Sequence, residues 1–94
     1  MRLTDYEYAA IKQTIALFDP DAKVYLFGSR VDDTQLGGDI DLLILSDHLQ
    51  RGDRGIIRWN LWEKIGEQKI DILIASDDSD PFVRLALKNG VPLL

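Results

Sequence analysis

Two short stretches decide the fold: VYLFGSR at residues 24–30 and DIDLLIL at residues 39–45. The first is β-branched and aromatic up to Gly28, which predicts a strand followed by a turn. The second is apolar on both faces beyond Asp41, which predicts a central, buried strand. A polar loop over residues 30–38 separates the two strands, so they are expected to pair as a hairpin.

Helical patterns flank these strands. Thr4 and Glu7 form a capping-box signature, and Asp80 followed by Pro81 is typical of a helix start. The predicted elements are helices at residues 4–18, 56–65 and 81–89, strands at 24–27, 39–45 and 69–75, and a short final strand at 91–94. The predicted fold class is therefore α/β of the α+β type, a small mixed sheet flanked by helices in the order α-β-β-α-β-α.

Length and composition limit the classes of protein to consider. The 94 residues are expected to form a single domain over residues 1–94. Acidic residues outnumber basic ones 16 to 11, giving a net charge of −5, which disfavours nucleic acid as a partner. The absence of cysteine excludes disulfides and thiolate metal sites and agrees with a cytoplasmic location. No apolar run or N-terminal signal pattern predicts contact with a membrane.

Three carboxylates fall within predicted strands rather than in loops. Asp39 and Asp41 are two residues apart and should share one face of their strand, and Asp71 interrupts an isoleucine-rich strand. Carboxylates close to a core repel each other, and an unpaired buried charge costs several kcal/mol. Mg²⁺ prefers such oxygen ligands together with substrate phosphates. A D-x-D pair alone is a weak indication, because such pairs often only begin a strand.

The Gly28-Ser29-Arg30 turn supplies groups that suit an anion. Glycine lets the backbone approach a bulky group, serine offers a hydroxyl and an N–H, and arginine offers a charged fork. The tripeptide lacks the spacing and the lysine of a P-loop, and it lacks the flanks of a nucleophile elbow. Taken alone, it is a common strand-to-loop turn.

Together, these motifs resemble the signature of the DNA polymerase β-like nucleotidyltransferase superfamily, and most closely its small prokaryotic members, the minimal nucleotidyltransferases. In that family a Gly-Ser pair precedes a D-x-D strand, and a third acid follows in a later strand. The resemblance covers residues 24–75 closely and the flanking helices only in their order. All motif positions are filled, which disfavours an inactive copy.

The resemblance implies the nucleotidyltransferase fold and metal-dependent transfer of a nucleoside monophosphate to a hydroxyl. The donor would be ATP or another nucleoside triphosphate. Asp39 and Asp41 would hold two Mg²⁺ ions, and Asp71 would bind the catalytic metal and help to activate the acceptor.

The remaining motif residues would bind the nucleotide. Ser29 and the Gly28 backbone would hold the terminal phosphates, with Arg30 as a further contact. Only 19 residues follow Ala75, so no dedicated pocket for the base is expected. Small members of the family pair with an all-helical HEPN protein, adenylylate one of its tyrosines and act as antitoxins, and the resemblance implies the same role here.

Two alternatives stay open at this point. The chain could be a non-catalytic antitoxin that masks a toxin by contact, or a transferase acting on a small molecule or a tRNA end. Self-association is the alternative to a helical partner.

Other features are interpreted structurally. Trp59 and Trp62 are assigned to core or dimer packing rather than to base stacking. The cluster of Arg51, Arg54 and Arg58 is assigned to a solvated face. The apolar face of the last helix is predicted to consist of Phe82, Leu85 and Ala86.

Overall fold

The computed structural model describes residues 2–32 and 38–94. Its elements are α1 (Asp5–Phe18), β1 (Lys23–Phe27), the 3₁₀ helix η1 (Gly28–Val31), β2 (Ile40–Leu45), the 3₁₀ helix η2 (Arg51–Asp53), α2 (Arg54–Ile65), β3 (Ile70–Ala75), α3 (Pro81–Asn89) and β4 (Val91–Pro92). This order confirms the prediction, including the short last strand. The loop predicted over 30–38 begins as η1, and its residues 33–37 lie outside the described part.

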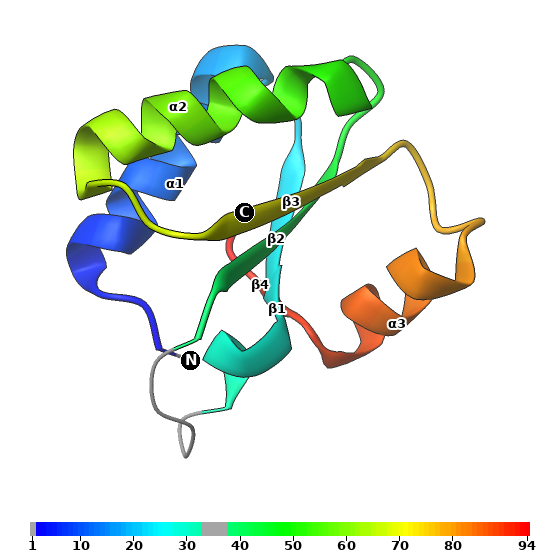
Figure 1. Cartoon of the computed structure of the whole chain (residues 1–94). Helices are drawn as coiled ribbons and strands as arrows, with labels where there is room; N and C mark the ends of the chain where they lie inside the picture. The colour runs from blue at the N-terminus through cyan, green and yellow to red at the C-terminus, as the bar shows by residue number, and fades with distance from the viewer. Residues whose placement is uncertain (1, 33–37) are drawn as a thin grey trace.

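The strands form one mixed sheet in the order β3-β2-β1-β4. β1 pairs antiparallel with β2 and with β4, whereas β2 and β3 are parallel. The antiparallel β1–β2 pair is the predicted hairpin. The parallel pair requires a crossover, and α2 provides it (Figure 1).

One face of the sheet is covered by α1 and α2, which Figure 1 shows on the opposite side from α3. The buried side chains of this layer are Ile11 and Ile15 of α1, Ile57 and Leu61 of α2, and Val24, Leu26, Ile40, Leu42, Ile44, Ile70 and Ile72 of the strands. Leu42, Leu43 and Ile44 are all fully buried, so β2 is the buried central strand that its sequence predicts. This layer supplies most of the apolar burial of the domain.

The other face is covered only in part, by α3. Val83 and Ala86 of α3 are buried against Leu43, whereas Phe82 and Leu85 are 54% and 55% exposed. The predicted apolar face of this helix was therefore wrong for two of its three residues. Successive residues are about 100° apart around a helix. Because Val83 and Ala86 pack against Leu43, the residues just before them, Phe82 and Leu85, lie at the edge of the contact and are half exposed.

Helix starts follow local capping. Thr4 Oγ1 accepts a 3.0 Å hydrogen bond from the Glu7 N–H, and the Thr4 N–H donates to Glu7 Oε1 at 2.9 Å, which confirms the capping box. α2 begins at Arg54, two residues earlier than predicted. The Gln50 N–H donates to Asp53 Oδ2 at 2.8 Å, and η2 leads directly into the helix.

Candidate active site

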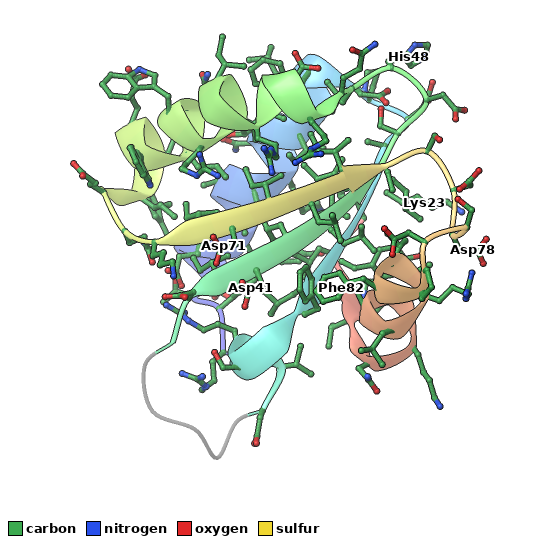
Figure 2. All side chains as sticks on the ribbon, turned by 45° about the vertical axis from the view of Figure 1, so that its right-hand side comes forward. Lys23, Asp41, His48, Asp71, Asp78 and Phe82 are labelled. Atoms are coloured by element: carbon green, nitrogen blue, oxygen red, sulfur yellow. The ribbon has the colours of Figure 1, made fainter. Side chains whose placement is uncertain are left out.

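The parallel pair β2–β3 brings two of the predicted catalytic acids together. In its register Asp41 is the direct partner of Asp71, and paired residues project to the same face of a sheet. Leu43 lies two residues beyond Asp41 and packs against α3, so both carboxylates lie on the α3 face. Figure 2 shows the two side chains projecting next to each other from their strands.

The position of Asp41 is electrostatically unfavourable for a carboxylate. Burial, the largest cause, together with the negative charges of Asp71 and Asp39 and a hydrogen bond with Asp71, raises the pKa of Asp41 to about 6. The positive charge of Lys69 acts in the opposite direction. A cation or a proton bound between Asp41 and Asp71 would relieve this repulsion.

Asp39 is the third acid, and its charge also acts on Asp41, but its carboxylate is ion-paired. It precedes the first residue of β2, and its Oδ2 lies 3.3 Å from the Lys69 ammonium. The hydrogen bond to Asp39, followed by its charge and that of Asp71, raises the pKa of Lys69. Within residues 2–32 and 38–94, no group of three or more metal-ligating side chains is arranged to hold a metal ion. Two of the three predicted ligands therefore meet, and the third is ion-paired.

Lys69 was missed by the sequence reasoning. A signal was present, because Lys69 is the first residue of the strand predicted over 69–75 and lies two residues before Asp71, so the two should share a face. Its ammonium supplies local positive charge to the acids.

Gly28 lies directly against the acid pair. β1 ends at Phe27, the register partner of Asp41, and the chain then turns into η1. Gly28 has a φ of 77°, and a Cβ at this position would collide with Asp41 Oδ2. Only glycine satisfies both the backbone conformation and the close approach. The predicted turn and the predicted acids are thus neighbours in space.

Ser29 faces the far end of the loop. A Cβ on Gly38, whose φ is 100°, would collide with Ser29 Oγ, so the two loop ends are in contact. The Ser29 carbonyl accepts hydrogen bonds from the Asp32 N–H at 3.1 Å and from Arg2 Nη2 at 3.0 Å. The hydroxyl of Ser29, the glycine turn and Gly38 therefore lie together at one corner of the molecule.

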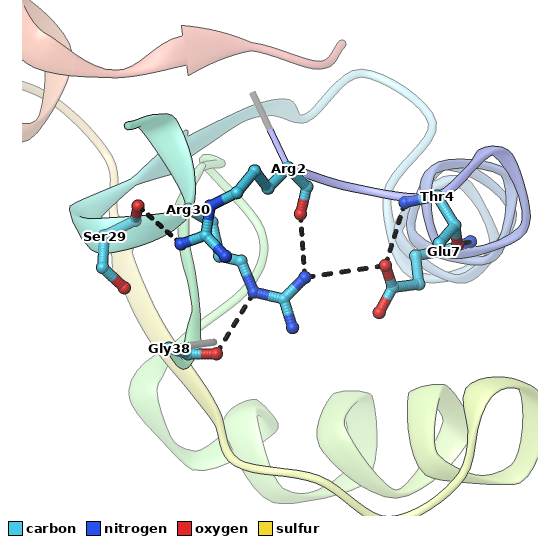
Figure 3. Close-up of polar contacts among 6 residues, drawn as sticks. All are labelled: Arg2, Thr4, Glu7, Ser29, Arg30 and Gly38. Carbon is cyan, nitrogen blue, oxygen red and sulfur yellow. Dashed lines mark hydrogen bonds and ion pairs between the residues drawn. The ribbon is translucent and has the colours of Figure 1, made fainter. Parts of the chain in front are cut away.

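The Arg30 guanidinium is engaged within the chain (Figure 3). Its Nε donates to the Gly38 carbonyl at 3.1 Å, and its Nη1 donates to the Arg2 carbonyl at 2.8 Å. Nη1 also lies 3.7 Å from Glu7 Oε1 in an ion pair, where the Arg30 side chain is only 17% exposed. Arg30 joins the turn to the loop end and to the start of α1.

Arg2 completes this arrangement from the other direction. Besides its bond to Ser29, its Nε donates to the Asp32 carbonyl at 3.0 Å, and its N–H donates to the Arg30 carbonyl at 2.8 Å. We refer to Arg2, Arg30 and Glu7 as the arginine clasp. No sequence pattern could have found Arg2, because it is a single charged residue far from the motif.

Residues of α2 hold the start of β3. Trp62 Nε1 donates to the Gln68 carbonyl at 2.7 Å, and Arg58 Nε donates to the Ile70 carbonyl at 2.8 Å. Trp62 packs against the core as predicted, whereas Trp59 is 59% exposed. Arg58 is not simply solvated: it satisfies a strand carbonyl next to Asp71.

A mixed sheet that carries paired acids beside a glycine turn is the architecture of a nucleotidyltransferase domain. Residues 9–94 match the family described as "Polymerase beta, Nucleotidyltransferase", and the chain belongs to this family. Its general activity is nucleotidyl transfer from a nucleoside triphosphate, and its members are typically metal-dependent. No curated protein matches the chain. In the described residues, no helix is long and apolar enough to span a membrane.

Proposed function

We propose that this chain transfers AMP from ATP to a hydroxyl on a partner protein, with Mg²⁺ as cofactor. The observation that carries the proposal is the close approach of Gly28 to Asp41, whose register partner is Asp71, because it places the glycine turn beside the paired acids. Family membership supports nucleotidyl transfer in general. The base, the acceptor and the partner are the parts that we add.

The residues around the pair fit Mg²⁺. This ion binds through one or two carboxylates together with substrate phosphates, and its charge would offset the burial and the repulsion that raise the pKa of Asp41. We assign Asp39, Asp41 and Asp71 as ligands of two ions. Lys69 is 69% exposed and can turn to solvent when Asp39 binds metal. When bound, Mg²⁺ neutralises charge on the triphosphate and on the leaving group.

The turn is the proposed holder of the terminal phosphates. Gly28 lets its backbone approach a phosphate closely, and Ser29 offers its hydroxyl. Arg30 is proposed as a further contact, and its bonds to Gly38 and Arg2 give it a second role in shaping the turn.

In the proposed transfer, the acceptor oxygen forms a bond to the α-phosphorus while the bond from that phosphorus to the bridging oxygen breaks. Pyrophosphate leaves, and the proton of the acceptor hydroxyl passes to solvent with the assistance of Asp71. The residues of the chain contribute alignment and electrostatic stabilisation rather than a covalent intermediate.

We infer that the partner is a helical protein of the HEPN type and that the chain acts as its antitoxin. The motif resemblance to minimal nucleotidyltransferases supports this inference. Exposed apolar surface supports a protein contact in general. The large exposed apolar side chains include Tyr6, Leu17, Ile56, Trp59, Phe82 and Leu85. Phe82 and Leu85 belong to α3, on the side of the sheet that carries the acids, so a partner that covers them would bring its hydroxyl to the acids.

The test is incubation of the purified chain with Mg²⁺ and ATP labelled at the α-phosphate, with and without the product of the neighbouring reading frame. We expect label to appear on the partner protein. Asp71→Asn should abolish labelling, whereas Asp78→Asn, which changes an exposed acid outside the site, should leave labelling unchanged.

Other results would redirect the proposal. Label on a small molecule, with a monomeric chain and no need for a partner, would favour the small-molecule transferase. A tight complex that neutralises the partner without transferring label, and that is unaffected by Asp71→Asn, would favour the non-catalytic antitoxin.

A further inference from the structure

A cavity of about 360 Å³ lies between η1 and α3, next to the acid pair. Its lining includes Phe27 and Gly28 at the end of β1, Val31 of η1, and Phe82, Leu85 and Asn89 of α3. The volume lies within the range of small-molecule sites in proteins. The brevity of the chain after β3 predicts no dedicated base pocket, yet α3 builds one wall of this cavity.

The cavity adjoins the proposed catalytic site at Gly28. Gly28 lines it and at the same time lies against the Asp41 carboxylate. Phe27, another lining residue, is the register partner of Asp41. In Figure 2, Phe82 lies on the same side of the sheet as Asp41 and Asp71. A ligand could therefore occupy the cavity and reach the acids around Gly28.

The residues that line the cavity suit an uncharged, aromatic part of such a ligand. The rings of Phe27 and Phe82 meet edge to face, with centroids 6.1 Å apart and an interplanar angle of 83°. This arrangement leaves ring surface of Phe82, which is 54% exposed, for a further aromatic partner. Among the described lining residues there is no cation, so phosphates are not favoured inside.

We infer that the cavity binds the base of the nucleoside triphosphate, stacked on Phe82, while the phosphates extend past Gly28 to Ser29 and the acids. This inference rests on the proposed function and adds the subsite for the base. Asn89 carries both a donor and an acceptor at the cavity and can pair with the edge of a base. A bound base would cover Phe82 and Leu85, which are exposed to solvent in the free chain.

The test compares two probes by NMR on the isotope-labelled chain: Mg-ATP and Mg-tripolyphosphate, each added to millimolar concentration. Both should shift the amide signals of Gly28 and Ser29. Only ATP should shift the methyl signals of Val31 and Leu85, because ring currents of a stacked base act on neighbouring methyl groups.

Variants of Phe82 make the test specific. Phe82→Ala should weaken ATP binding about tenfold, which is the size expected for loss of one base-stacking contact, and should leave tripolyphosphate binding unchanged. Phe82→Trp should restore ATP binding. The matched control is Trp59→Ala, which removes an equally exposed ring from α2 and should change neither affinity.

Several outcomes would overturn the inference. If ATP shifts Gly28 and Ser29 but not the two methyl groups, the base lies elsewhere and the proposed function survives. If Phe82→Ala weakens the binding of both probes equally, the substitution acts on the turn at Gly28 and Ser29 and not on the base. If it leaves ATP binding intact but weakens pairing with the helical partner, a protein side chain occupies the cavity. If neither probe shifts any signal, both the inference and the proposed function fail.

Discussion

The two faces of the sheet differ in how completely they are packed. On the face of α1 and α2, side chains such as Ile15 and Leu61 are fully buried. On the α3 face, burial is centred on Leu43, and the neighbouring surface carries the acid pair and the cavity. The strand residues that face α1 and α2 are apolar. The alternate residues, which face α3, include Asp41 and its register partner Asp71.

This difference separates stability from chemistry within one small sheet. Residues of β2 alternate between the faces, so a single strand both completes the core through Leu42 and presents Asp41 for catalysis. The burial and the charge repulsion that raise the pKa of Asp41 are tolerated because the opposite face supplies the packing.

The largest effect is expected from Asp41→Asn. An amide cannot replace the charge of a carboxylate towards Mg²⁺, so transfer from labelled ATP should fall at least about a hundredfold, equivalent to several kcal/mol of transition-state stabilisation. The circular dichroism spectrum should not change. Asp21→Asn, at the opposite end of β1, serves as the control and should retain full transfer. Retained activity in the Asp41 variant would remove this residue from the site.

The next effect compares one leucine on each face. Leu61→Ala removes a fully buried side chain and should lower the free energy of unfolding by about 3 kcal/mol. Leu85→Ala removes a side chain that is 55% exposed and should cost less than about 1 kcal/mol. Urea denaturation of both variants measures the difference. Equal losses would mean that the α3 face contributes to stability as much as the other face.

Most of the fold could be predicted from the sequence, because its signals are local. The capping box at Thr4, the proline after Asp80 and the apolar run of β2 each act within a few residues. The exposed position of Phe82 could not be predicted, because periodicity gives a helix face only to within one residue. Packing against Leu43 decides which neighbouring pair is buried.

The candidate site divides in the same way. The approach of Asp41 to Gly28 follows from strand parity and a hairpin, both visible in the sequence. The ion pair of Asp39 with Lys69 and the bonds of Arg2 to the turn join residues far apart in the chain. Such contacts depend on strand order and on side-chain reach, which motif spacing does not contain.

A smaller effect is expected from the arginine clasp. Arg30→Ala removes two hydrogen bonds to carbonyl groups and the ion pair with Glu7, and it should cost about 1–2 kcal/mol of unfolding free energy. The affinity for Mg-tripolyphosphate should fall as well, because the turn loses its fixed shape. Arg51→Ala, an exposed substitution before α2, is the control for lost charge. If the melting temperature is unchanged and phosphate binding is weaker, Arg30 contacts the phosphates directly and does not stabilise the turn.

The smallest effect concerns pH and the metal-free chain. The pKa of Asp41 is raised from 3.8 to about 6 in the folded state, so between these values the folded chain holds a proton that the unfolded chain has released. Asp41 therefore favours folding at low pH, and this contribution is lost as the pH rises through about 6. In EDTA at neutral pH, Asp41→Asn should be more stable than the wild type by about 1 kcal/mol, after allowance for solvent screening.

The difference in stability between the wild type and Asp41→Asn reports on Asp41 alone, because the other titrating groups are present in both. The pKa of Asp19 is lowered, chiefly by the hydrogen bond from Ser46, so its contribution is lost as the pH falls and is the same in both chains. Thermal melts in EDTA should therefore diverge as the pH rises from 3.8 to about 6 and stay apart by a constant amount above it. Mg²⁺ should close the gap at neutral pH by stabilising the wild type alone, since its binding to the folded state adds to stability. A variant that melts well below the wild type in EDTA would show instead that the carboxylate is structural, and the proposed separation between a packing face and a reactive face would not hold at Asp41.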